Sequence, residues 1–499
     1  MTSIRNDTSA INAVGPSAAV AIGLALAWCP CEALAHGFAK RYDLPIPLGF
    51  YLAGAGATVA VSFVLLALFA RDWPTGRDGR AVEVPLPGLG RTLSQLWIAG
   101  ALQTLSAAML LLVIVAGFIG NDDPYKNIAP TFVWVIWWVG MMFVNTFVGN
   151  VWAVVNPWNA WFAGAEALLR RIKPGARLDF GDPYPPRLGV WPGVILFLAF
   201  AWLELIWGEG EDPASLARAI VGYSLLTWAG MAVFGRRVWL DHGEAFTVVF
   251  STFARFAPIF WRAGERVLAL RPPGAGLLVE TPITVPMVAL VMVMLATVTF
   301  DGVLVTPAWT AYYEFWKLMP SLQPMWQAGW MTVALGFWML ATPPLIAFPL
   351  MFAGVFVGCC RISAALAGGV GTGEVARRFA LTFLPIAIAY HFAHYLTYLL
   401  LTGQYFIPTM SDPFGFGWDM FATAAYQADI GLIDAKFHWT VSVISIVTGH
   451  IIAVFLAHLT ATRLFKDHRR VILSQLPMLA VMVGYTMLSL WIIAQPTVE

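Results

Sequence analysis

The chain has 499 residues, of which 59% are hydrophobic and only 11% are charged, and its formal net charge is +1. Soluble domains carry about 25% charged residues, so this much apolar surface needs lipid as its solvent. The small net charge gives no reason to expect a nucleic acid as a partner. We therefore expect an all-α, multi-pass membrane protein whose main partner is the lipid bilayer.

The first 35 residues have the pattern of a secretory signal peptide. Arg5 lies in a polar start, residues 18–28 are apolar, and Ala33-Leu34-Ala35 forms a small-x-small cleavage site. The apolar run is about half of the ~20 residues that span a bilayer, which favours a removable signal over the alternative, an uncleaved anchor. Cleavage would leave His36 as the N-terminus. Its amino group and imidazole together could chelate a metal such as copper, or it could simply be the residue that follows the cut.

Residues 36–499 are interpreted as one polytopic membrane domain. About ten apolar runs are long enough to cross a bilayer, and most of the 29 Lys and Arg residues fall in alternate loops between them. Because basic loops stay in the cytoplasm, this pattern places the mature N-terminus in the periplasm and the protein in the bacterial inner membrane. The runs begin near residues 47, 97, 130, 188, 214, 283, 329, 379, 437 and 475.

Two segments depart from simple spans. Residues 246–270 combine regularly spaced phenylalanines with Arg255, Arg262 and Arg266, which predicts an amphipathic helix lying on the cytoplasmic interface. The apolar run over 329–360 is too long for one straight span and contains Pro343-Pro344, so we expect it to kink or break there.

Ionisable residues at membrane depth are the best guide to function, because they are costly in lipid and usually face the inside of a bundle. Glu204 and Asp301 lie near the outward ends of the fourth and sixth predicted spans. We take these two acids as candidate catalytic residues. In the eighth span, over residues 379–403, His391 and His394 are three positions apart and so project from one helix face.

The ninth predicted span, residues 437–461, carries His438, His450 and His458. His391 and His450 lie at similar depths along antiparallel helices, so the two could meet if these helices are neighbours. Three histidines and a carboxylate would make a plausible site for zinc, copper or iron, with His438 as a further candidate ligand. The alternative is that the histidines only hydrogen-bond across the bundle.

Several short motifs resemble those of a family of bacterial membrane proteins commonly labelled fenitrothion hydrolase, over residues 36 to about 461. The resemblance implies a membrane protein that hydrolyses an organophosphorus or other apolar ester, by attack of a metal-activated water with Asp301 or Glu204 as the base. The motifs are His36-Gly37, residues 43–47, Asn156-Pro157-Trp158-Asn159, residues 243–246, residues 300–302, residues 389–395, Gly449-His450 and Ala457-His458.

Three functional hypotheses follow. The first is a metal-dependent membrane enzyme whose site opens to the periplasm and accepts an apolar small molecule. The second is a redox protein that binds copper or haem b, with His391 or His394 and His450 as axial haem ligands. The third is a transporter or accessory protein for a metal or small molecule, in which buried acids and histidines form a path.

Overall fold

A computed structural model describes residues 42–69, 83–86, 96–261, 268–278, 280–329 and 332–495. Within these ranges nine helices are long and apolar enough to cross a membrane, and α9 (Trp191–Leu205) is a further, shorter apolar helix. The prediction of an all-α, multi-pass membrane protein is therefore confirmed. The predicted signal peptide and His36 lie outside the described residues.

The spanning elements follow the predicted runs closely. Near residue 130 one span is built from three consecutive pieces, because a π-helix separates two α-helices. The elements are α2 (Leu48–Phe69), α4 (Leu96–Ile119), α5 (Ile128–Pro130) with η1 (Thr131–Gly140) and α6 (Met141–Phe147), α10 (Pro213–Phe234), α13 (Val285–Leu304), α16 (Val333–Ala367), α18 (Leu384–Leu401), α20 (Ala435–Leu464) and α21 (His468–Ala494).

Shorter elements connect the spans. They are the helices α7 (Trp152–Val155), α8 (Pro157–Ile172), α11 (Arg236–His242), α12 (Ala245–Phe253), η2 (Ala275–Leu277), α14 (Pro307–Lys317), α15 (Gln323–Gln327), α17 (Thr372–Phe379), η3 (Ala380–Phe383), η4 (Thr402–Tyr405) and α19 (Phe406–Ser411), and the strands β1 (Val84–Leu86), β2 (Ile259–Trp261) and β3 (Leu268–Leu270).

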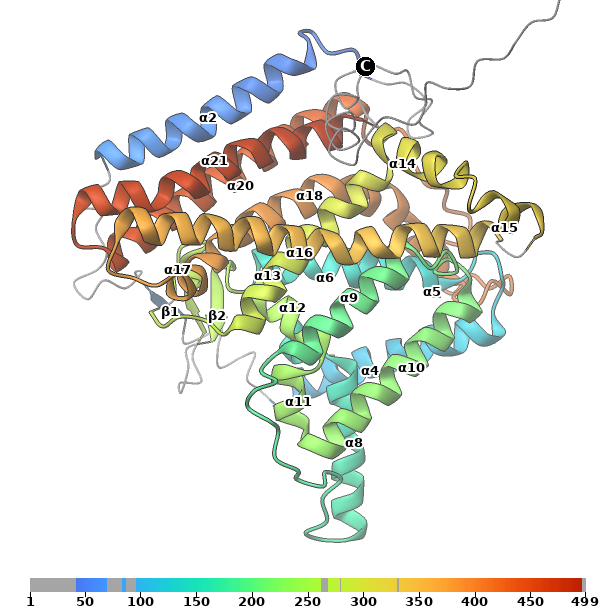
Figure 1. The fold of residues 1–499 in the computed structure, drawn as a ribbon. Coiled ribbons are helices and arrows are strands. Elements are labelled where there is room, and N and C mark those ends of the chain that lie inside the picture. The colour runs from blue at the N-terminus through green and yellow to red at the C-terminus, as the bar shows by residue number, and fades with distance from the viewer. Residues whose placement is uncertain are drawn as a thin grey trace, which may run out of the picture.

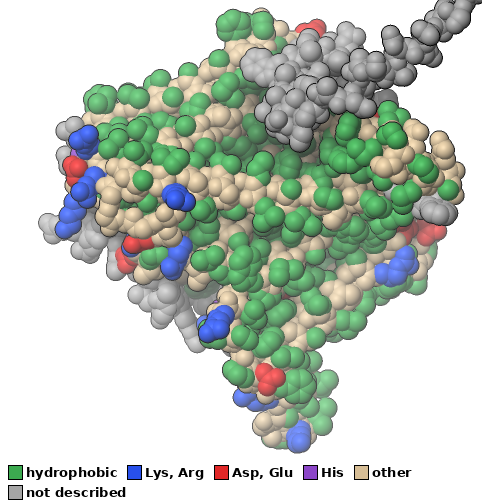
Figure 2. All heavy atoms as spheres, in the orientation of Figure 1, with side chains coloured by type: hydrophobic (Ala, Val, Ile, Leu, Met, Phe, Trp, Pro, Cys, Tyr) green, Lys and Arg blue, Asp and Glu red, His purple; other side chains and the backbone are tan. Residues whose placement is uncertain are grey.

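The helices form a larger and a smaller group (Figure 1). In the larger group α20 packs between α18 and α21, α16 lies along α13 and α21, and α2 covers α20 and α21. The smaller group contains α4, α8, α10 and α11, and α9 joins it to α13. Figure 2 shows most of the Lys and Arg side chains of this face at its left and lower edges, and a wide apolar surface with few charges between them. This distribution is what a lipid-facing surface requires.

Local sequence signals explain where several helices begin. Asp434 caps α20 by accepting a hydrogen bond from the backbone N–H of Phe437, and Asp212 caps α10 in the same way through Ser215. Asn156 caps α8, with Pro157 in the first helical position. The Asn-Pro pair of the Asn156–Asn159 motif thus has a structural role.

The predicted amphipathic helix over residues 246–270 is wrong beyond residue 253. The helix α12 ends there and is buried rather than interfacial, and residues 259–261 and 268–270 form strands β2 and β3. Strand β3 also pairs with β1, which gives a small antiparallel sheet in the order β1-β3-β2. Pro258 has no backbone N–H to donate and disfavours helical geometry in the residue before it, so the helix cannot run on.

Of the two expectations for Pro343-Pro344, a kink or a break, the break is not found. The helix α16 is continuous over 35 residues, with Pro343, Pro344 and Pro349 inside it. Neighbouring helices can stabilise a membrane helix whose prolines remove backbone hydrogen bonds, and α13 and α21 both pack along α16.

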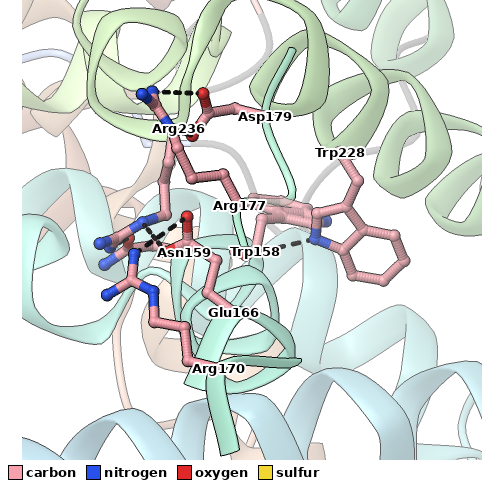
Figure 3. Close-up of polar contacts among 8 residues, drawn as sticks. All are labelled: Trp158, Asn159, Glu166, Arg170, Arg177, Asp179, Trp228 and Arg236. Atoms are coloured by element: carbon pink, nitrogen blue, oxygen red, sulfur yellow. Dashed lines mark hydrogen bonds and ion pairs between the residues drawn. The ribbon is translucent and has the colours of Figure 1, made fainter. Parts of the chain in front are cut away.

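A polar network fixes the helix α8, which projects from the smaller group (Figures 1 and 3). The nearly buried Glu166 lies 3.4 Å from Arg236 Nε and 3.9 Å from Arg170 Nη2. Arg236 also donates to Asn159 Oδ1 at 2.6 Å, and Trp228 donates to the carbonyl of Trp158 at 3.2 Å. The base of α8 is therefore held by charged hydrogen bonds to the segment that follows α10.

Candidate functional site

Two acidic side chains from different helices meet on one tyrosine. Glu204 of α9 and Asp301 of α13 both contact the hydroxyl of Tyr395 in α18, at 3.1 Å to Glu204 Oε1 and 2.5 Å to Asp301 Oδ2. A phenol has one hydrogen and so can donate to only one carboxylate at a time. The second contact is a hydrogen bond when a carboxyl group itself carries the proton. The geometry therefore suits two acids that share protons through a tyrosine.

A histidine and a tryptophan complete this group. His394 Nε2 lies 2.9 Å from Asp301 Oδ2, which is an ion pair when the imidazole is protonated. Trp138 donates its indole N–H to Glu204 Oε1 at 2.7 Å. We call Trp138, Glu204, Asp301, His394 and Tyr395 the acid cluster. Each acid thus has a neutral or basic donor in addition to Tyr395, as buried carboxyl groups require.

His391 lies beside the acid cluster. Its ring is buried and contacts Tyr395, with ring centroids 4.5 Å apart, and also Phe143 and Trp138. Its Nε2 atom is buried without a hydrogen-bond partner among the described residues. A cavity of ≈ 20 Å³ lined by His391, Glu204 and Tyr395 lies next to this ring. Such a volume holds about one water molecule, and polar groups on its wall favour occupancy.

Close helix packing creates this arrangement. A Cβ atom on Gly302, the residue after Asp301, would lie 2.3 Å from Tyr390 Oη and 2.6 Å from Ile492 Cγ2. A Cβ atom on Gly449 would lie 2.3 Å from the Cβ of Ala389. Both positions require glycine, because any side chain would push α13 or α20 away from α18. The predicted adjacency of the helices that carry His391 and His450 is confirmed.

The other candidate histidines contact residues outside the acid cluster. The imidazole of His450 packs 5.8 Å from the ring of Tyr485, whose hydroxyl is 2.5 Å from Thr299 Oγ1. His438 Nδ1 lies 2.7 Å from Thr397 Oγ1. His458 Nδ1 lies 3.3 Å from Gln475 Nε2. The structure thus brings His391, His394, Glu204 and Asp301 together and gives His438 and His450 other neighbours.

Buried polar atoms without partners are concentrated on the same helices. Hydrogen bonds normally satisfy such atoms, so each exception needs an explanation such as internal water. In the described part of the chain ten such side-chain atoms are found, and six of them belong to α18, α20 and α21, which pack together. The six are Tyr390 Oη, His391 Nε2, Trp439 Nε1, His450 Nε2, Gln475 Oε1 and Ser489 Oγ.

The described residues do not form a ready metal or haem site. Among the described residues, no group of three or more His, Cys, Asp or Glu side chains is arranged to hold a metal ion. His394 and Asp301 pair with each other. His391 and Glu204 are therefore the potential metal ligands that face the cavity. The cavity beside His391 is also far too small for a haem. The predicted metal, and the role of His36 in binding it, stay predictions.

Two members of the acid cluster were not predicted from the sequence. Tyr395 follows His394 directly in the motif Tyr390–Tyr395, so its position was a usable signal. Trp138 lies in η1, the ten-residue π-helix. Because π-helices are rare and often occur at functional sites, η1 is itself a pointer to this region, but its hydrogen-bonding pattern cannot be recognised in a run of apolar residues.

Comparisons with protein-family models, curated proteins and solved structures give no significant match to this chain. The resemblance to the proteins labelled fenitrothion hydrolase therefore stays a prediction, and function has to be argued from the site.

Proposed function

We propose that this chain is a proton-coupled membrane transporter in which the acid cluster binds and releases the coupling proton. The observation that carries the proposal is the single hydroxyl of Tyr395 placed between Glu204 and Asp301. Acids and histidines inside a membrane bundle are typical of proton relays, and a phenol between two carboxyl groups lets a proton pass from one to the other.

The buried polar atoms support a path that leads away from the cluster. Tyr390 lies against Gly302, next to Asp301, while Tyr485 contacts both Thr299 and His450. Further along α20, towards its other end, His458 and Gln475 form another buried polar pair. Internal water at the unpartnered atoms of these residues would connect the groups and allow proton transfer across much of the bundle.

The proposal is tested by the charge movement that accompanies proton binding. Purified protein is reconstituted in vesicles on a solid-supported membrane, and a pH jump is applied in the absence of any substrate. We expect a transient current that falls at least tenfold in the double variant Glu204→Gln/Asp301→Asn. The matched control is Glu314→Gln, because Glu314 is a half-exposed acid in α14 that pairs with Lys317 of the same helix. A double variant with the current of the wild type would overturn the proposal.

A second candidate function is the metal-dependent enzyme acting on an apolar ester, as the resemblance implies. The observation in its favour is that His391 Nε2 and Glu204 line the same small cavity, where they could supply two ligands or activate a water. Elemental analysis of the full-length protein separates the two functions. Stoichiometric metal that is lost in His391→Ala supports the enzyme, whereas metal-free protein with a proton current supports the transporter.

A further inference from the structure

A second, larger cavity lies in the smaller helix group, between α4, η1, α9 and α10. Its volume is ≈ 340 Å³, within the range of pockets that bind small organic ligands. Phe200 lines this cavity and packs against Trp138 of the acid cluster, with ring centroids 4.7 Å apart. The inference drawn from this cavity does not depend on the proposed transport function.

Several polar groups of the cavity wall already form hydrogen bonds within the protein. Trp134, Trp152 and Trp158 line the cavity but donate their indole N–H groups to Gly210 O, Thr247 Oγ1 and Ser224 Oγ, none of which lines it. The hydroxyl of Tyr223 likewise donates to the buried Glu244, at 2.5 Å. The wall therefore presents mainly ring faces and aliphatic groups to an occupant, so the cavity favours a hydrocarbon over a polar molecule.

The cavity is long and opens towards lipid. Its lining on α4 runs from Leu102 to Val113, which is about 16 Å along the helix axis. On the same helix Leu105 lines the cavity and is 61% exposed, so its side chain also faces the surroundings of the bundle. In a bilayer those surroundings are acyl chains. An elongated, laterally open space of this kind fits a linear chain that enters from the membrane.

We propose that this cavity binds one acyl chain of a membrane phospholipid, which enters from the side of the bundle on which Leu105 of α4 is exposed. The occupant is a phospholipid because lipid is the solvent at the opening, and because the wall is mainly apolar and so suits a hydrocarbon chain.

The proposal predicts contacts that surface lipid cannot make. Phe246 and Trp152 line the cavity yet are only 3% and 1% exposed, so a lipid outside the bundle does not reach them. Leu111 of α4 is 48% exposed and does not line the cavity, so it reports ordinary surface lipid. The full-length protein in nanodiscs is irradiated with a phosphatidylcholine that carries a diazirine in one acyl chain, and the labelled residues are mapped by mass spectrometry.

We expect labelling of Phe246 or Trp152 as well as Leu111. Ala219→Trp fills the cavity from α10. It should reduce the labelling of Phe246 and Trp152 at least fivefold and leave the labelling of Leu111 unchanged. Ala199→Phe, which fills the cavity from α9, should have the same two effects. Ala108→Trp is the matched control, because Ala108 is exposed on α4 and does not line the cavity.

Labelling confined to Leu111 in the wild type overturns the proposal. The proposal is also overturned if an isoprenoid quinone abolishes the labelling of Phe246 while excess unlabelled phosphatidylcholine does not reduce it.

Discussion

Replacing Tyr395 with phenylalanine tests the centre of the acid cluster with a minimal change. The substitution keeps the ring that packs on His391 and removes only the hydroxyl between Glu204 and Asp301. Hydrogen bonds to charged groups contribute about 1.5–3 kcal/mol, whereas side-chain hydrogen bonds between membrane helices average about 0.6 kcal/mol. Because the hydroxyl donates to one carboxyl group and accepts a hydrogen bond from the other, its removal takes one hydrogen-bond partner from each acid. We therefore expect a loss of about 2 kcal/mol, roughly a 30-fold change in the unfolding equilibrium.

The loss is measured by unfolding the protein in mixed detergent micelles with increasing SDS. Tyr398→Phe is the matched control, because Tyr398 lies one turn further along α18, is 36% exposed and makes no hydrogen bond through its hydroxyl to the described residues. Combining Tyr395→Phe with Asp301→Asn should give a coupling energy of about 1 kcal/mol or more. Additive effects within about 0.3 kcal/mol would refute the shared hydrogen bond, as would equal losses in the two tyrosine variants.

Three further predictions concern other parts of the fold. Gly449→Ala should destabilise the protein by about 1–3 kcal/mol in the same SDS assay, because its Cβ would lie 2.3 Å from that of Ala389, whereas Gly484→Ala, with nothing within 4 Å, should be neutral or slightly stabilising. Glu166→Gln should raise hydrogen–deuterium exchange in α8 and leave α18 unchanged, because it removes the charge that faces Arg236 and Arg170; equal protection of α8 in both proteins would contradict this. Hydrogen bonds from Ser215, together with nearby Arg218, hold the pKa of Asp212 below its ordinary value of 3.8. Its contribution is therefore present above pH 4 and lost as the pH falls through the lowered pKa, so Asp212→Ala should cost about 1 kcal/mol at pH 7 and less near pH 3.

The helices were predictable because a bilayer imposes one requirement on every span. Each must satisfy its backbone hydrogen bonds internally and present apolar side chains for about 20 residues, and both features can be recognised in the sequence. The errors came where protein rather than lipid surrounds the chain. In residues 246–270 aromatic and basic side chains imitate an interfacial helix, but packing buries α12 and Pro258 ends its helical course. In α16 neighbouring helices stabilise three prolines that would disrupt an isolated helix.

The candidate site was only partly predictable. The positions of Glu204, Asp301, His391 and His394 were recognisable, because an ionisable residue within an apolar run stands out against its neighbours. Their partners were not. Tyr395 and Trp138 are common residue types in membrane helices. The position of Tyr395 next to His394 points to the site, but it does not reveal the hydrogen bonds to two distant acids. The expected meeting of His450 with His391 and His394 relied on depth alone, and in the structure His450 packs on Tyr485 instead.

The sequence by itself thus determined the class of this protein, the approximate limits of its spans and the rare polar residues inside them, because each depends on a stretch of about 20 residues and its solvent. Only the tertiary structure decided which of those polar residues meet. Glu204, Asp301 and Tyr395 come from α9, α13 and α18, which are far apart in the chain. Their contact depends on the rotation and separation of the helices. Close approach at Gly302 and Gly449 sets that geometry, because a side chain at either position would not fit.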